Sequence, residues 1–124
     1  MINYNGRLFR PVENAESGEA GAKTLFHYYQ SGSVVWAEYS GGEVLRGHLI
    51  AVAAPDGSLD MRYHHINQSG DLKTGVCHST PELLADGRLI LNESWEWTSG
   101  DRSSGSSRLA EISPEPADAF SGNE

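Results

Sequence analysis

Short turn sequences recur at nearly regular intervals along this chain, and they constrain its fold more than any other feature. Each contains a glycine beside Asp, Ser or a second Gly, and such pairs tolerate the positive φ angles of tight hairpin turns. The five turns are Gln30-Ser31-Gly32-Ser33, Ser40-Gly41-Gly42-Glu43, Pro55-Asp56-Gly57-Ser58, Gln68-Ser69-Gly70-Asp71 and Ala85-Asp86-Gly87-Arg88. The segments between them are rich in Val, Ile, Leu, Tyr, Trp and Thr, as strands require. The pattern predicts a series of β-hairpins.

Eight strands follow from this spacing. We expect them near residues 4–12, 23–30, 33–40, 43–53, 58–67, 71–80, 87–98 and 106–112. Two longer connections interrupt the rhythm, an acidic, glycine-containing loop over 13–22 and a polar, mobile loop over 99–106. The best helix candidate is one turn over 80–84, which reads equally well as the end of a strand.

The turn lengths also predict how the strands are aligned. If each turn has two central residues, His48 lies opposite His65 and His78 lies opposite Trp95. One face of the sheet then collects most of the large apolar side chains: Phe26, Tyr28, Val35, Tyr39, Val44, Ile50, Val52, Met61, Tyr63, Leu72, Val76, Leu91, Trp95 and Trp97. The other face is mostly polar, and it also carries Trp36, Leu45, Leu49, Cys77 and Ser79.

This division of faces is typical of a half-buried antiparallel sheet. Because no helix is expected to cover the apolar face, the sheet must close on itself or fold over as a sandwich. Sequential tight turns favour closure. We therefore predict an all-β fold, a single antiparallel up-and-down β-barrel of about eight strands, lipocalin-like, over residues 1–112. An open β-sandwich is the alternative, and residues 113–124 are expected to form a flexible acidic tail.

The charge balance argues against two classes of partner. Nine basic and seventeen acidic residues give a formal charge of −8, and the basic residues are scattered. Such a surface repels nucleic acid and anionic lipid, and no apolar run approaches the roughly 20 residues of a spanning helix. The first residues lack a signal-peptide pattern, and the single Cys77 cannot form an internal disulfide. We expect a cytoplasmic protein that binds neither nucleic acid nor membrane.

Polar side chains share the predicted inner face with the aromatic ones. They are Arg46, His48, His65, Thr74, His78 and Glu93. An unpaired buried polar group costs about 1–3 kcal/mol, so these groups either bond to tyrosines and water or line a ligand cavity. The candidate ligand-binding residues are Tyr28, Tyr39, Arg46, His48, Tyr63, His65, His78, Glu93, Trp95 and Trp97. The two tryptophans could stack on a planar ligand or simply fill the core.

Acid–base chemistry is a second possibility for this face. His78 with Glu93, or His48 with His65, could titrate near neutrality in a partly buried site, which makes these four the candidate catalytic residues. A metal site is disfavoured, because His78 lies about 13 Å along the sheet from His65 and no further ligand can be placed. We expect neither a metal nor a cofactor.

The most distinctive strings in the chain are the stretches 2–7, 35–42, 47–51, 60–67 and 95–101. Together they resemble a family of short bacterial proteins labelled N-acetylglutamate synthase. The resemblance implies acetyl transfer from acetyl-CoA to glutamate. Acetyltransferases of the usual fold hold the CoA pyrophosphate at a glycine-rich loop that begins a helix. The nearest string, Arg102-Ser103-Ser104-Gly105-Ser106-Ser107, has Ser where Gly or Ala belongs, and no helix is expected after it.

Three functional hypotheses remain. The leading one is a non-enzymatic barrel that binds a small aromatic or amphipathic molecule in its interior. The second is a small enzyme that uses the histidine and glutamate pairs above. The third is a self-associating structural module, such as a homodimer, in which the outward-facing Trp36, Leu45 and Leu49 form the contact.

Overall fold

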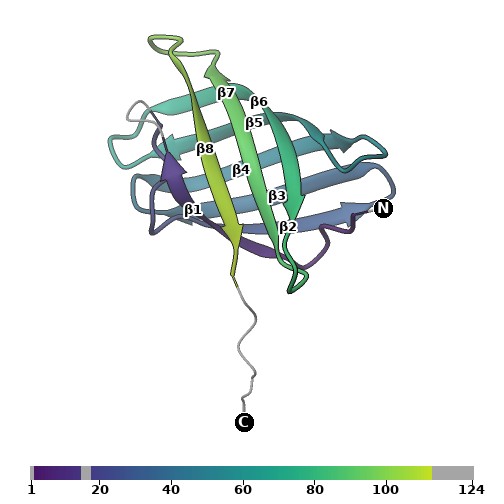
Figure 1. Cartoon of the computed structure of the whole chain (residues 1–124). Helices are drawn as coiled ribbons and strands as arrows, with labels where there is room; N and C mark the ends of the chain where they lie inside the picture. The colour runs from purple at the N-terminus through teal and green to yellow at the C-terminus, as the bar shows by residue number, and fades with distance from the viewer. Residues whose placement is uncertain (1, 15–17, 113–124) are drawn as a thin grey trace.

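A computed structural model describes residues 2–14 and 18–112 of the chain, and it consists of eight antiparallel strands (Figure 1). The tail expected over 113–124 lies outside the described residues. The strands are β1 (Leu8–Asn14), β2 (Leu25–Ser31), β3 (Val34–Gly41), β4 (Val44–Ala53), β5 (Leu59–Asn67), β6 (Leu72–Leu83), β7 (Leu89–Trp97) and β8 (Ser104–Glu111). The predicted strands match these in number and order.

Each strand pairs with its neighbour in sequence, and β1 pairs with β8, so the sheet closes into a barrel. The predicted up-and-down barrel is therefore confirmed, and the open sandwich is not formed. Within the described residues there is no helix, and the segment 80–83 continues β6 as a strand. No helix of the described part is long and apolar enough to cross a membrane.

The register prediction was wrong at all five hairpins. At the β2–β3 and β3–β4 hairpins the turn lies further along the chain than expected, and β3–β4 also has a bulge between Tyr39 and Gly41, so that Val35 pairs with Ala51 and not with His48.

At the other three hairpins the error is one residue, because their turns hold three residues instead of two. At the β4–β5 turn, Ala54 N donates to Ser58 O and Gly57 N donates to Ala54 O. Gly57 has a φ of 89°, as the left-handed position of such a turn requires. The same pair of hydrogen bonds recurs in the turns at 67–71 and 84–88. His48 consequently pairs with His64, and His65 pairs with Lys73.

A shift of one residue moves every side chain of a strand to the other face. On β4, Leu49 is 4% exposed and faces the core, whereas Ile50 is 58% exposed. On β6, Cys77 and Ser79 are buried and Leu72 is exposed. The predicted inward positions of Ile50, Val52, Leu72 and Val76, and the outward positions of Leu49, Cys77 and Ser79, were therefore wrong.

The interior of the barrel is filled by side chains that alternate along all eight strands. Two glycines make room for rings. A Cβ on Gly47 would lie 2.4 Å from the ring of Tyr39, and one on Gly75 would lie 2.2 Å from the ring of Tyr63. Both tyrosine rings therefore lie against a glycine of the neighbouring strand, and the hydroxyl of Tyr39 reaches His65.

The N-terminal segment closes one end of the barrel. Tyr4 is fully buried, packs on the ring of Tyr28, and donates a hydrogen bond of 2.5 Å to the carbonyl of Gly57. Arg7 holds the segment in place through an ion pair of 2.6 Å with Glu111. The connection between β1 and β2, together with the turns β3–β4 and β5–β6, lies at the opposite end, which we call the mouth.

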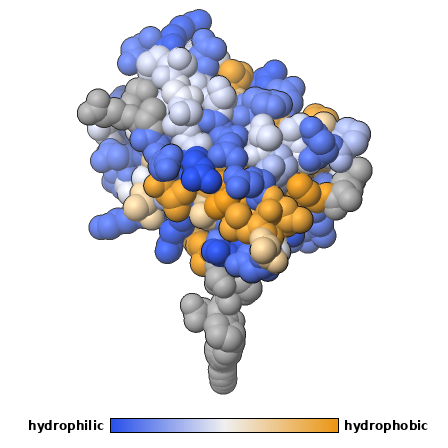
Figure 2. All heavy atoms as spheres, viewed as in Figure 1, coloured by the Kyte–Doolittle hydropathy of each residue, from blue (hydrophilic) through white to orange (hydrophobic). Residues whose placement is uncertain are grey.

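The outer surface is polar with apolar areas between. Figure 2 shows a band of apolar side chains across the face formed by β1, β7 and β8. Exposed apolar residues also occur on β3 and β4, where Val34 pairs with Val52 and Trp36 pairs with Ile50.

Candidate ligand-binding cavity

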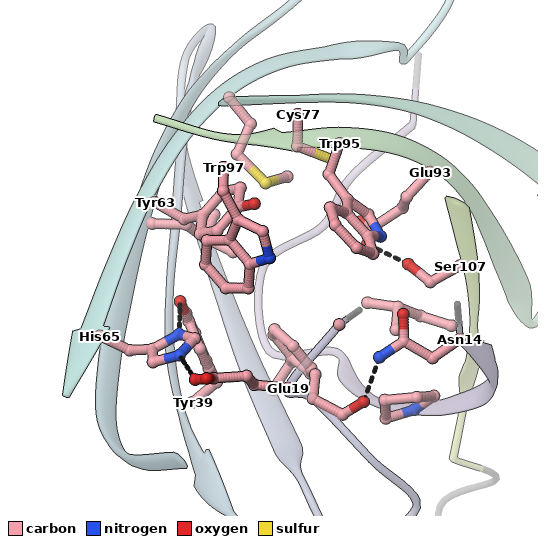
Figure 3. A pocket seen from close by; sticks show the side chains of 17 residues that line it. Asn14, Glu19, Tyr39, Tyr63, His65, Cys77, Glu93, Trp95, Trp97 and Ser107 are labelled. Carbon is pink, nitrogen blue, oxygen red and sulfur yellow. Dashed lines mark hydrogen bonds and ion pairs between the residues drawn. The ribbon is translucent and has the colours of Figure 1, made fainter. Parts of the chain in front are cut away.

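A cavity lies inside the barrel between the mouth and the core. The space open to the centres of water molecules is about 60 Å³, so the cavity has room for a small molecule. The cavity is lined by Pro11, Asn14, Gly18, Glu19, Ala20, Phe26, Tyr39, Leu49, Met61, Tyr63, His65, Cys77, Glu93, Trp95, Trp97, Ser107 and Leu109. Figure 3 shows aromatic side chains on one side and polar groups at two separate places.

The aromatic wall is formed by a continuous group of rings. Trp97 contacts Trp95, Tyr63 and His65, with ring centroids 5.8, 5.5 and 5.5 Å apart. On the opposite side, Phe26 stacks on Tyr39 at 4.6 Å. Flat rings of this kind offer large apolar surfaces at low conformational cost.

The first polar group is a hydrogen-bonded chain at the mouth. His65, only 3% exposed, lies with Nε2 at 2.7 Å from Glu19 Oε1 and Nδ1 at 3.0 Å from the Tyr39 hydroxyl. Burial lowers the pKa of His65 below its usual value, although the hydrogen bond to Glu19 partly offsets this. The imidazole is therefore neutral at pH 7, with Nε2–H donating to Glu19 and Nδ1 accepting from Tyr39.

Glu19 is held from several sides although it belongs to a loop. Burial raises the pKa of Glu19, but hydrogen bonds from His65 and Asn67 and the charge of Lys73 lower it more, so it stays ionised. Asn67 Nδ2 donates at 3.1 Å and Lys73 Nζ lies 3.7 Å away. The same ammonium sits 4.8 Å from the ring centroid of Trp97. Thr24 anchors the end of the loop with a 2.9 Å hydrogen bond to the carbonyl of Gly41.

The second polar group is a row across the inner wall. Glu93 pairs in register with Ser79 on β6 and with Ser107 on β8, and Ser107 pairs with Asn14 on β1. Ser107 donates a long hydrogen bond of 3.4 Å to Glu93 Oε1. Burial raises the pKa of Glu93 to about 7, against the lowering effect of the two serine hydroxyls. We call these four residues the inner polar row.

Six of the predicted ligand-binding residues line this cavity: Tyr39, Tyr63, His65, Glu93, Trp95 and Trp97. Tyr28 faces inward too, but it is fully buried in the core below and does not line the cavity. Arg46, His48 and His78 are exposed on the outside of the barrel, because of the register shift, and their predicted inward positions were wrong. Thr74 also faces outward, and its hydroxyl bonds to that of Thr98.

Neither predicted catalytic pair is formed. His48 and His65 lie on opposite faces of the sheet, and so do His78 and Glu93. His48 instead lies beside His64 on the outer surface, with ring centroids 5.9 Å apart. Over residues 2–14 and 18–112, no group of three or more His, Cys, Asp or Glu side chains could hold a metal ion.

Sequence reasoning missed Glu19, Asn67, Asn14 and the two serines of the inner polar row. Glu19 lies within the acidic loop expected over 13–22, and nothing in the local pattern distinguishes it from Glu13 or Glu16. Ser79 was assigned to the outer face by the register error. Asn14 and Ser107 come from the two strands that close the barrel, whose pairing no tight turn specifies.

The chain falls in the class of closed eight-stranded β-barrels, whose interiors are either filled by side chains or wide enough to hold one small ligand. The model of the avidin-like protein family matches residues 2–112. The chain belongs to the avidin-like family. No curated protein and no solved structure matches it, and the resemblance to proteins labelled N-acetylglutamate synthase is not shown by any comparison.

Proposed function

We propose that this protein binds one small planar molecule in the barrel cavity and does not transform it. The observation that carries this proposal is the cavity itself, in which an aromatic wall faces two separate polar groups. Ligand sites in proteins combine mainly apolar linings with a few placed polar groups in this way. Membership of the avidin-like family supports the same class of function.

The size of the cavity limits the ligand. A space of about 60 Å³ for water centres suits a ligand with a single ring. The two tryptophans would stack on the faces or edges of such a ring. A larger molecule would have to displace the loop that carries Glu19.

Binding is favoured over catalysis because two titratable groups of the cavity wall, Glu93 and His65, form no pair with each other among the described residues. Both nitrogens of His65 are engaged, with Glu19 and Tyr39. Cys77, whose pKa burial raises strongly, stays a thiol at neutral pH and is a poor nucleophile. The acetyl transfer implied by the sequence resemblance has no support in a barrel whose described residues contain no helix to hold a pyrophosphate.

Tryptophan fluorescence provides the test, since Trp95 and Trp97 line the cavity. Titration with a panel of single-ring heterocycles, with biotin included because streptavidin holds it in an eight-stranded barrel, is expected to change the emission saturably. A Trp97→Phe variant should weaken binding, whereas Trp36→Phe on the outer face should not. If no panel member binds in native mass spectrometry or fluorescence, the proposal fails.

Self-association is a second proposal, made for the outer face of β3 and β4. The predicted contact of Trp36, Leu45 and Leu49 needs revision, because Leu49 is in the core. Trp36 stacks on Tyr29 at 5.7 Å, beside exposed Ile50 and Val52. An Ile50→Asp variant that sediments as the same species as the parent protein would contradict a homodimer through this face.

We also propose a cytoplasmic location, on the ground that the one cysteine is a buried free thiol. Fractionation of the source cells with an antibody tests it, and recovery outside the cytoplasm would contradict it.

A further inference from the structure

The inner polar row contains an acid without a basic partner. No ion pair joins Glu93 to a lysine, arginine or histidine within the described residues. The hydrogen bond that it accepts from Ser107 is long. Ser79 Oγ, next to it in register, is fully buried and forms no well-shaped hydrogen bond, and Asn14 Oδ1 is also buried without a donor. Buried polar groups in native proteins are nearly always paired.

The polar atoms of this row that a ligand in the cavity can reach are oxygens on one wall: the Asn14 amide oxygen from β1, the Glu93 carboxylate from β7 and the Ser107 hydroxyl from β8. Ser79, on β6, does not line the cavity and acts through its neighbour Glu93. A ligand rich in N–H donors would satisfy several of them together. A ligand carboxylate would instead meet oxygens and a second negative charge.

The charge of the whole cavity also favours a cationic ligand. Two carboxyl groups, Glu19 and Glu93, line it, and none of the lining residues is a lysine or arginine. Lys73 lies at the mouth, where it is shared between Glu19 and the ring of Trp97. In a low-dielectric interior such an arrangement attracts a cation and repels an anion.

We propose that the inner polar row receives the cationic, N–H-donating head of a small aromatic ligand, such as an aryl amidine, with Glu93 as its counter-ion. This inference rests on the proposed function and specifies its ligand class. The aromatic body of the ligand lies against Trp95 and Trp97, and its planar head forms two hydrogen bonds to the Glu93 carboxylate.

Three probes of matched shape separate this inference from binding in general: benzamidine, benzamide and benzoate. They share one ring and differ in head-group charge. Calorimetric titration at pH 7.5 is expected to rank benzamidine at least tenfold above benzamide, with benzoate weakest. Glu93→Gln should remove the preference for benzamidine, and Ser79→Ala should weaken it. Glu96→Gln, on the outer face of the same strand, is the matched control.

Proton release on binding is a second measurement, and it would not change if Glu93 had only a structural role. Because Glu93 is partly protonated near neutrality, benzamidine should displace a proton at pH 6 to 7, measured in two buffers of different ionisation enthalpy. The interior groups around it are Ser79, Ser107 and Asn14, with His65 and Glu19 across the cavity. Glu13, His78 and Arg108 line a shallow outer hollow on the same wall.

His65 also titrates in acid, so the decisive comparison is between the parent protein and Glu93→Gln. The proposal is supported if the parent protein releases a proton and binds benzamidine more tightly from pH 5 to 8, and if Glu93→Gln loses both effects. Equal or tighter binding of benzamide or benzoate overturns this inference and leaves the proposed function intact. Absence of binding by all three probes overturns it as well, while the proposed function is then decided by the heterocycle panel.

Discussion

Glu19 and His65 lie 46 positions apart in the chain, yet Oε1 of the carboxylate is 2.7 Å from Nε2 of the imidazole. This bond ties the β1–β2 connection to β5 across the mouth of the barrel. Both groups are partly withdrawn from solvent, so the bond keeps more of its strength than a surface ion pair does. The closed position of the loop therefore depends on it.

Replacing Glu19 with Gln should loosen the mouth. The variant loses a charge-assisted bond, and an amide also conflicts with the donor Nδ2 of Asn67, so we expect about 1–2 kcal/mol of destabilisation at pH 7. The pKa of Glu19 is lowered in the folded state, so its stabilising contribution is present above about 4.5 and is lost as the pH falls through the folded pKa.

Amide hydrogen exchange over 18–24, compared at pH 7 and pH 4, measures this effect. Exchange should be faster in the variant at pH 7, and the difference should be smaller at pH 4, where part of the contribution of Glu19 is lost. The exposed Glu43 serves as the control position. Unchanged exchange at pH 7 would show that the loop is held by its backbone contacts alone.

Replacing Glu93 with Gln should stabilise the protein above neutral pH. The folded pKa of about 7 exceeds the ordinary value of 4.5, so the parent protein loses stability as the pH rises from 4.5 through 7, when the buried acid must ionise. Because the side chain is partly accessible, we expect a gain on the order of 1–3 kcal/mol at pH 8, given that a tenfold change in an acid's ionisation constant is worth about 1.4 kcal/mol. Urea denaturation at pH 4 and 8 checks it, and a gain of equal size at both values would contradict the assignment.

The neighbours Leu49 and Ile50 provide a direct test of the β4 register. Leu49→Ala removes a buried side chain and should cost about 2–5 kcal/mol, whereas Ile50→Ala on the outer face should cost less than about 1 kcal/mol. Thermal unfolding of the two variants measures the difference. The reverse order would restore the register in which Ile50 and His48 face inward.

Gly75 should not tolerate a methyl group. A Cβ there would lie 2.2 Å from the ring of Tyr63, so Gly75→Ala must displace the ring and should cost about 1–3 kcal/mol. It should also change the fluorescence of Trp97, which contacts Tyr63. Gly21→Ala is the matched control, because nothing lies within 4 Å of the added atom. Equal stability of both variants would contradict this packing.

The fold was predictable because turn residues and strand composition act locally. The closed barrel followed from sequential hairpins and one apolar face, and neither depends on exact register. The cavity was predictable only in part. Phe26, Tyr39 and Trp97 face inward as expected. The three-residue turns and the mispredicted β3–β4 register reversed the faces of β4 and β6, and this left His48 and His78 outside.

The position of the glycine distinguishes a two-residue turn from a three-residue turn, because in the latter the glycine is the third residue of the turn. Ala54-Pro55-Asp56-Gly57-Ser58 suits a type I turn, since Pro55 fits its second position and Gly57 the left-handed position after it. That signal was available in the sequence. The contact of Glu19 with His65 was not, because it depends on the path of a long loop and on no periodic pattern.

Tyr4 closes the end of the barrel opposite the mouth, and this affects where a fusion partner or a surface tether can be joined. Ile2 lies against the turn at Gly57, and Leu8 O accepts a hydrogen bond from Ile112 N, so the described residues begin and end at the sealed end of the barrel. A fusion partner or a surface tether joined at either terminus would therefore sit behind the barrel. Molecules would still enter and leave past Glu19 without obstruction, and exchange rates measured on an immobilised sample should equal those in free solution.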